Sequence, residues 1–422
     1  MTTLRLLRSF PLSVRLLLVN QLGVNTGFYL LIPYLATHLG QDLGMSAALV
    51  GVVLGVRNLS QQGLFLIGGS ASDRLGARSV IIVGCGLRTV GFGLFAIGDS
   101  LTVLLAASVL SGLAGALFNP AVRAYLSVAA ADRRAEAFSL FNVFANTGAL
   151  LGPLLGSALL VVGFRASAVV AALVFAVLTV AQTMALPALP VKPSRGTVLG
   201  DWRECLTNRR FVAFTLALTG MFALQNQLYL VLPMQAEWAT GQAGSVAAVF
   251  LVSTMASLAL QVRITQWCQR RVSRGVAIAV GLGLMGAAFF VPLLGSALLP
   301  ATTAPPGGFV AAAVRLAPVL VAVFTMSLGL MVAQPFVLEL IPAFGRDGLS
   351  GTYFGVFYLV SGVVAAGGNA VIGWASAGSG SGVAWPAWLL CAAAGLASAA
   401  AVRWLDRRGA VSPAHANVEM SR

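Results

Sequence analysis

Long apolar runs alternate with short polar segments along almost the whole of this 422-residue chain. Each run is close to the length of about 20 apolar residues that a helix needs to cross a membrane. Because lipid offers no hydrogen-bond partner to an open backbone, we expect these runs to be helices. The pattern predicts twelve helices, over residues 14–38, 47–69, 79–97, 101–128, 137–162, 165–186, 211–235, 245–265, 275–299, 311–338, 352–374 and 384–404.

The longest polar interruption divides these helices six and six. It covers residues 187–210, holds three prolines, and contains the segment Asp201-Trp202-Arg203-Glu204, which predicts a short surface helix. We therefore predict an all-α polytopic membrane protein of two six-helix bundles, a fold typical of transporters with a central cavity. The predicted bundles are residues 1–186 and 211–404, with a cytoplasmic linker at 187–210 and a cytoplasmic tail at 405–422.

The charges are few and unevenly placed. Only 9% of residues are charged, against roughly 25% in soluble domains. The net charge of +14 comes from bases in alternate interhelical segments, such as those of Arg134 and Arg271, whereas the opposite segments carry Asp42 and Asp99. Since basic loops stay in the cytoplasm, both termini are predicted to be cytoplasmic. The bases then set topology and attract anionic lipid, so we expect no nucleic-acid partner.

Other classes of protein find little support in the sequence. The four cysteines form no C-x-x-C pair, and the two histidines, His38 and His415, lie far apart, so we expect no metal site. No G-x-x-x-x-G-K loop indicates an ATP-driven pump, and no His/Cys/Asp cluster suits catalysis within a membrane. We expect neither an enzyme nor a cofactor. A signalling scaffold would not need arginines in the middle of apolar helices.

The polar segment after the second predicted helix reads G-S-A-S-D-R-L-G-A-R over residues 69–78. It resembles the signature segment of the major facilitator superfamily, G-x-x-x-D-R-x-G-x-R. The matching residues are Gly69, Asp73, Arg74, Gly76 and Arg78. We expect tight turns at both glycines. The resemblance implies that Asp73 is a latch that accepts hydrogen bonds from the start of the eleventh helix, with Arg74 and Arg123 tuning its charge.

A second motif lies in the fifth predicted helix, as G-x-x-x-G-P-x-x-G. Its residues are Gly148, Gly152, Pro153 and Gly156. The motif resembles the antiporter motif of the same superfamily, which implies export, a kink at Pro153, and glycines that admit the eighth helix. Close packing alone is the alternative interpretation. With residues 50–63, 86–88 and 110–123, these features resemble the MdtH-type multidrug-resistance branch of the drug:proton antiporters, strongly in the first half of the chain.

Arg57 and Arg88 lie in the middle of predicted helices, where a charged side chain is costly. Such bases either face a wet cavity or hold a polar network together. The predicted cavity residues are Asn20, Asn25, Tyr29, Arg57, Gln61, Arg88, Gln225, Asn226 and Asn369. The related branch tends to have a carboxylate in the first helix where this chain has Asn20. Asp73 and Glu339 are therefore the candidates for proton coupling.

These observations together predict a secondary active transporter that exports small amphiphilic molecules or drugs by alternating access, with proton antiport. We expect it in the bacterial cytoplasmic membrane as a monomer, with a small-molecule substrate, protons and membrane lipids as its partners. Uptake or facilitated diffusion of a neutral or anionic metabolite is the alternative, and the missing acid in the first helix favours it.

Overall fold

The fold is taken from a computed structural model that describes residues 3–189, 196–242, 244–298, 308–376 and 383–411. Over these residues the chain is helical and contains no strand. Eleven spans are long and apolar enough to cross a membrane, or twelve if the bent pair α3 and α4 counts as one. The axes of that pair differ by 44°. The predicted all-α, multi-pass fold is confirmed.

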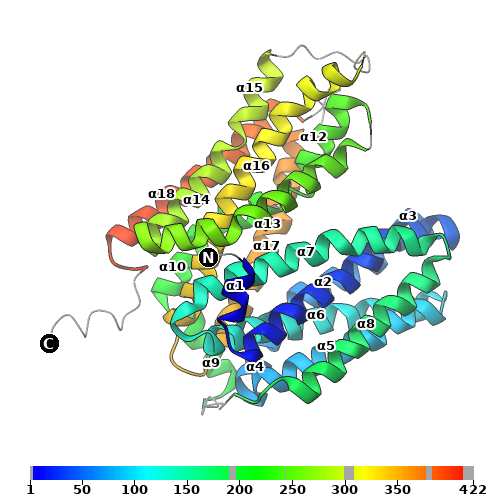
Figure 1. Ribbon diagram of the computed structural model, residues 1–422, viewed down its shortest axis with the longest axis vertical. Coiled ribbons are helices and arrows are strands. Elements are labelled where there is room, and N and C mark those ends of the chain that lie inside the picture. Colours follow the sequence, from blue (N-terminus) through cyan, green and yellow to red (C-terminus); the bar gives the residue numbers. More distant parts are fainter. Residues whose placement is uncertain (1–2, 190–195, 243, 299–307, 377–382, 412–422) are drawn as a thin grey trace. The chain divides into compact units, whose positions relative to one another are not determined.

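The chain forms two compact units (Figure 1). The first comprises Met1–Thr207 and Ile341–Leu359, and the second comprises Asn208–Leu340 and Val360–Arg422. The first unit contains α1 (Thr3–Arg8), α2 (Leu12–Thr37), α3 (Ala47–Gly63), α4 (Phe65–Leu75), α5 (Ala77–Ile97), α6 (Leu101–Ala129), α7 (Arg134–Leu160), α8 (Phe164–Ala185), α9 (Val198–Thr207) and the start of α17 (Ser350–Ser376). The helix α17 therefore begins in one unit and continues in the other.

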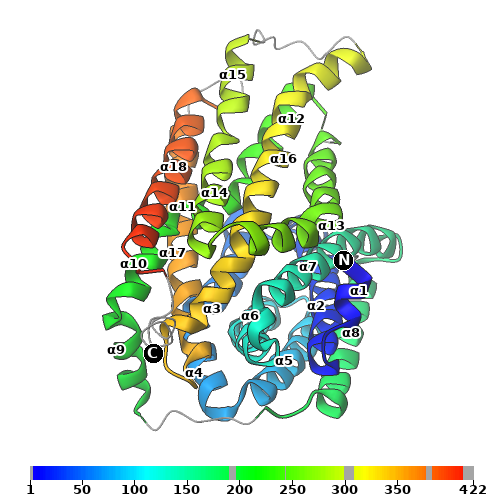
Figure 2. The same cartoon turned by 60° about the vertical axis from the view of Figure 1, so that its left-hand side comes forward.

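Five helix pairings organise the first unit. α2 lies along α7, α5 packs on both α6 and α8, and α3 and α4 pack on α6. Hydroxyl groups begin two of these helices, because the Ser46 and Ser100 side chains accept hydrogen bonds from the amides of Leu49 and Val103, each at 3.4 Å. Figures 1 and 2 both show the short helix α9 beside α4.

The second unit is built around α14, which packs on α16 and α18. It contains α10 (Arg209–Ala217), α11 (Thr219–Gln227), α12 (Val231–Thr240), α13 (Ser245–Arg271), α14 (Arg274–Ala287), α15 (Phe290–Leu298), α16 (Phe309–Leu340), the remainder of α17, and α18 (Trp385–Arg407). Where one helix was predicted over residues 211–235, the chain forms three consecutive short helices, α10, α11 and α12.

The signature segment is more helical than its sequence suggested. Gly69 lies inside α4, so the predicted tight turn at Gly69 is wrong. The turn at Gly76 is confirmed: its φ of +84° lies in a region that side chains with a Cβ rarely adopt. Asp73 and Arg74 consequently occupy the last turn of a helix.

Candidate functional site

Asp73 is held by the first residues of α17. Its Oδ1 accepts a hydrogen bond from the backbone N–H of Gly351 at 2.7 Å, and its Oδ2 accepts from the backbone N–H of Thr352 at 2.6 Å and from the Thr352 hydroxyl at 2.7 Å. The first amides of a helix have no partner within that helix and carry its positive end. The 7% exposed carboxylate of Asp73 satisfies them. We call these three hydrogen bonds the latch.

Glycines allow the two helix backbones to touch beside the latch. A Cβ on Gly69 would lie 2.1 Å from the carbonyl oxygen of Gly351, and one on Gly351 would lie 2.4 Å from that of Gly69. One turn further along α17, a Cβ on Gly355 would lie 2.7 Å from the carbonyl oxygen of Phe65. Any side chain at these positions would separate α4 from α17, and the latch depends on their contact.

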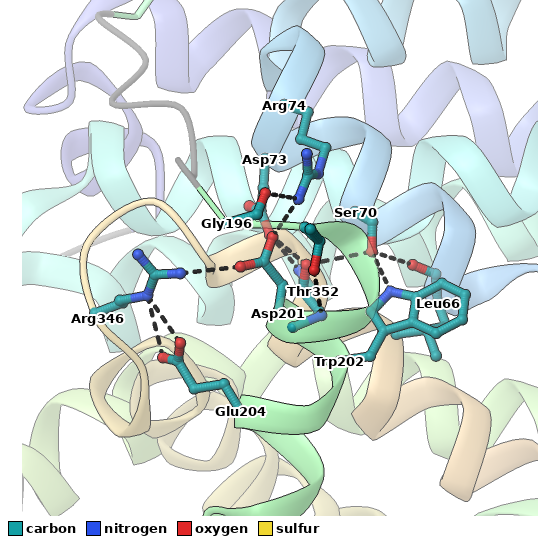
Figure 3. A network of polar contacts seen from close by, with 12 residues as sticks. Leu66, Ser70, Asp73, Arg74, Gly196, Asp201, Trp202, Glu204, Arg346 and Thr352 are labelled. Atoms are coloured by element: carbon teal, nitrogen blue, oxygen red, sulfur yellow. Dashed lines mark hydrogen bonds and ion pairs between the residues drawn. The ribbon is translucent and has the colours of Figure 1, made fainter.

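The linker helix α9 adds an ion-pair network to the latch (Figure 3). Asp201, whose side chain is 3% exposed, pairs with Arg74 at 2.7 Å and with Arg346 at 2.9 Å. Glu204, one turn later, also pairs with Arg346 at 2.9 Å. One carboxylate of the linker thus joins α4 to the segment that leads into α17.

Two further side chains of α9 point into the same region. The Trp202 indole donates to the Ser70 hydroxyl at 2.7 Å, and that hydroxyl lies 3.4 Å from the hydroxyl of Thr352 (Figure 3). Cys205 is fully buried. Burial and the neighbouring carboxylates, Glu204 foremost, raise the pKa of the Cys205 thiol to about 12. The packed linker therefore encloses an unreactive thiol.

The arginines of the signature do not bind Asp73. Arg74 donates to Asp201 and to the carbonyl oxygen of Gly196, both at 2.7 Å. Arg123 donates to the carbonyl oxygen of Asn119 at 2.8 Å and places its guanidinium over the ring of Tyr358 at 4.6 Å. Neither arginine forms a hydrogen bond or ion pair with Asp73 in the contacts described above, and their tuning of its charge stays a prediction.

Arg78, the last residue of the signature, fastens two other helices. Its guanidinium donates to the carbonyl oxygens of Leu186 at 2.6 Å and Thr183 at 2.7 Å. These carbonyls lie at the end of α8, where an arginine also complements the negative end of the helix. Arg78 thus joins the start of α5 to the end of α8.

The motif of α7 packs inside the first unit. A Cβ on Gly148 would lie 2.4 Å from the carbonyl oxygen of Leu22, and one on Gly156 would lie 2.4 Å from that of Leu30. Gly152 lies between them against Tyr29 and Thr26. These glycines therefore admit α2. The expectation that they admit the eighth predicted helix, residues 245–265, which corresponds to α13, is corrected. Pro153 lies within α7, which runs unbroken from Arg134 to Leu160, and its carbonyl accepts from the Tyr34 hydroxyl at 2.7 Å.

Some predicted cavity residues of the first unit contact one another. Arg57 donates to the Gln61 side chain at 3.1 Å, one turn later on α3. Asn25 donates to the backbone carbonyl of Ala145 on α7 at 2.8 Å. Asn20 and Arg88 are both buried. Tyr29 packs edge-on against Phe28, with ring centroids 5.1 Å apart. The predicted cavity residues that lie in the first unit are Asn20, Asn25, Tyr29, Arg57, Gln61 and Arg88.

In the second unit the polar contact involves an unpredicted residue. Gln227, which is fully buried, donates to Asn369 at 3.0 Å. The predicted Asn226 instead donates to the carbonyl oxygen of Phe222 in its own helix at 2.9 Å, and Gln225 is half-buried. Glu339 pairs with Arg274 at 3.0 Å. Among the residues that the structure describes, no group of three His, Cys, Asp or Glu side chains is arranged to hold a metal.

Sequence reasoning missed Arg346 and the role of the linker carboxylates. Asp201 and Glu204 are three residues apart on one helical face, a spacing that is visible in the sequence. Their partner Arg346 is 142 residues from Glu204, and no local pattern points to it.

Comparisons with known proteins agree on one family. The family model of the Major Facilitator Superfamily matches residues 17–369. An uncharacterised MFS-type transporter of Mycobacterium tuberculosis is 40% identical over 370 residues, which are 87% of this chain and 86% of that protein. The multidrug resistance protein MdtH of Cronobacter sakazakii is 34% identical over 270 residues, which are 64% of this chain and 67% of that protein.

A solved structure gives the same fold. The human organic anion transporter MFSD10 superposes with a TM-score of 0.70 at 17% identity, covering 92% of this chain and 98% of that chain. At that identity the likeness concerns the fold alone. The resemblance that the two sequence motifs carried, to the superfamily and to MdtH within it, is confirmed.

Proposed function

Because this chain belongs to the major facilitator superfamily and is a multi-pass membrane transporter of small molecules, we propose that it exports small amphiphilic molecules or drugs by alternating access, coupled to proton antiport. It is not an enzyme. We place it in the bacterial cytoplasmic membrane as a monomer with both termini in the cytoplasm. Its further partners are then protons and membrane lipids, and nucleic acid is not among them.

The latch is the observation that carries this proposal. Alternating access needs a contact that is complete in one state and broken in another. Asp73 makes three hydrogen bonds of 2.6–2.7 Å to the first residues of α17. That helix starts in the first unit and continues in the second, so releasing its first turn alters the connection between the units. The residues proposed for the latch and its surroundings are Gly69, Asp73, Arg74, Gly76, Arg78 and Arg123.

The direction of transport rests on the relatives. The proteins that share about a third of their residues with this chain over two thirds of its length are named multidrug resistance proteins. The α7 motif, Gly148, Gly152, Pro153 and Gly156, also favours export, since it resembles that of antiporters. Its contacts with α2 suit a rigid helix pair that moves as one body.

Two carboxylates are proposed for proton coupling. Protonation of Asp73 would turn an acceptor of three hydrogen bonds into a partial donor and so weaken the latch. Glu339 is 9% exposed, pairs with Arg274, and has one oxygen without a hydrogen bond. Protonation there would break a partly buried ion pair. Either event links proton binding to a change of state.

One observation favours the second candidate function. The first unit holds Asn20 where the related branch tends to have an acid, and it buries Arg57 and Arg88. A buried acid is the usual proton carrier, and none is found at this position. Its absence favours an uptake carrier or facilitator for a neutral or anionic metabolite, which needs no proton exchange.

Flux through proteoliposomes of the purified protein separates these candidates. Cationic, neutral and anionic amphiphiles are each tested with and without an imposed pH gradient, using the wild type, Asp73→Asn and Glu339→Gln. We expect the gradient to drive accumulation in the wild type. Asp73→Asn is expected to lower the initial rate at least about tenfold, because an amide cannot accept all three hydrogen bonds.

Asp99→Asn is the matched control, because Asp99 pairs with the exposed Arg165 away from the latch. It should transport like the wild type. Gradient-driven flux that survives in both Asp73→Asn and Glu339→Gln would reject these residues as proton carriers. Flux that is indifferent to the gradient would reject antiport and support a facilitator.

A further inference from the structure

Arg57 on α3 and Arg88 on α5 are buried charges within the first unit. Their exposed fractions are 6% and 5%. Arg88 lies within a span long enough to cross a membrane, and Arg57 lies within the bent pair α3 and α4, which is long enough only if the two count as one span. An unpaired charge is costly in such a position. Neither forms an ion pair with an aspartate or glutamate of the described chain. Arg74 and Arg274, by contrast, pair with Asp201 and Glu339.

Neutral groups give Arg57 only partial compensation. Its guanidinium donates to the side-chain oxygens of Asn58 at 2.8 Å and Gln61 at 3.1 Å, and lies 4.6 Å from the ring centroid of Phe28. Its Nε has no hydrogen-bond partner. Amide dipoles and one aromatic face stabilise a cation by about 1–2 kcal/mol each, and none of them supplies a negative charge.

Arg88 is compensated even less. Its guanidinium lies over the rings of Phe118 and Phe175, at 5.0 and 5.5 Å from their centroids. One of its terminal nitrogens is buried without a hydrogen bond. The guanidinium of Arg88 is also close enough to repel that of Arg57. Two like charges are thus buried in one unit without a carboxylate paired to either, which leaves this region short of an anion.

A polar amide lies against the same part of α5. Asn20 of α2 is 1% exposed and contacts the thiol of Cys85, which lies one turn before Arg88. Both polar atoms of the Asn20 amide are buried without a hydrogen-bond partner. Donors without a carboxylate among them, bordered by three phenylalanine rings, suit a ligand with an anionic head and an apolar body.

We infer that Arg57 and Arg88 bind the anionic group, such as a carboxylate, of an amphiphilic organic solute whose apolar part contacts Phe28, Phe118 and Phe175. The assignment of this ligand as the transported solute rests on the proposed function, whereas binding itself does not. The class of substrate is then organic anions, and the missing acid in α2 is a consequence of that class.

The test is the melting temperature of the purified wild-type protein with 1-naphthoate or with 1-naphthamide. These two probes have nearly the same shape and differ in charge. We expect the melting temperature to rise with naphthoate concentration and to stay unchanged with naphthamide. Arg57→Gln and Arg88→Gln should each weaken naphthoate binding at least about tenfold, because each removes a charge-assisted hydrogen bond.

The same variants distinguish a ligand site from a structural network. Without ligand, Arg57→Gln and Arg88→Gln remove an uncompensated buried charge, so their melting temperatures should equal or exceed that of the wild type. A structural arginine would give a lower melting temperature. If a glutamine variant does not fold, Arg57→Lys and Arg88→Lys keep the charge. Their melting temperatures must still rise with naphthoate and stay unchanged with naphthamide.

Arg165→Gln is the matched control, because Arg165 is exposed and paired with Asp99, and its response to naphthoate should match the wild type. Equal stabilisation by both probes, or no response to naphthoate, overturns the inference. The inference is also overturned if sodium chloride abolishes the naphthoate response when the total ionic strength is held constant, since the site would then bind an inorganic anion. Binding of naphthoate without flux would reject its transport and leave the anion site standing.

Discussion

At Gly69 a single methyl group is enough to separate α4 from α17. The added Cβ of Gly69→Ala would lie 2.1 Å from the carbonyl oxygen of Gly351. Since backbone atoms cannot rotate aside, we expect the variant to lose about 1–3 kcal/mol of stability, as overpacked interiors do. The melting temperature of the purified protein measures this loss.

Gly51→Ala provides the control for Gly69→Ala. Gly51 lies in α3 and a Cβ there meets no atom within 4 Å. Alanine favours a helix over glycine by about 1 kcal/mol, so Gly51→Ala should be neutral or stabilising. Equal melting temperatures for the two variants would contradict the close contact between α4 and α17.

Thr352 contributes a side-chain hydrogen bond that can be removed at nearly constant volume. Its hydroxyl donates to Asp73 at 2.7 Å. Thr352→Val should lower stability by about 1–3 kcal/mol, because a charged acceptor loses a buried donor. Thr352→Ser keeps the hydroxyl and should retain most of the wild-type melting temperature. A similar loss in both variants would assign the effect to packing instead.

At the scale of the element, α9 decides whether Cys205 is accessible. Its thiol is fully buried and has a pKa of about 12, so almost none of it is the reactive thiolate at pH 8. Asp201→Asn removes the shared partner of Arg74 and Arg346. We expect alkylation of Cys205 by a maleimide at pH 8 to be at least about tenfold faster in this variant, because α9 leaves its site more often.

Mass spectrometry of the labelled peptides reports the rate at Cys205 separately from the other three cysteines. Asp99→Asn, which also breaks an ion pair of the first unit, should leave this rate unchanged. An unchanged rate in Asp201→Asn would mean that the ion pairs do not hold α9 in place.

At the scale of the whole molecule, the distribution of arginines predicts which ends face the cytoplasm. Gln41 and Arg407 are exposed and lie in segments predicted to be on opposite sides of the membrane. With intact cells and a membrane-impermeant maleimide, Gln41→Cys should be labelled, and Arg407→Cys should be labelled only after the cells are opened. The four native cysteines are buried, which keeps background labelling low.

The reverse pattern of labelling would invert the topology and place the latch on the outer side. Labelling of both positions from outside would contradict the odd number of crossings predicted between residues 41 and 407, and would identify a missing or extra crossing. The bent pair α3 and α4 is the place to examine in that case.

The sequence predicted Asp73 well because both halves of its interaction leave local signs. A carboxylate at the end of an apolar run is unusual, and a helix start always offers free amides. It predicted Arg74 poorly, because an arginine can reach partners in many directions and Asp201 is 127 residues away. The α7 glycines were recognised as a contact surface, but glycine spacing does not name the partner helix, and α2 was found there.

The sequence by itself determined the class of this protein. Apolar runs of membrane length, arginines in alternate loops and two short motifs suffice for that, because each depends only on neighbouring residues and on the properties of the bilayer. Only the tertiary structure decided which distant groups meet. The docking of α9 through Asp201, the packing of α7 on α2, and the burial of Arg57 and Arg88 without a carboxylate all depend on contacts between residues far apart in the chain.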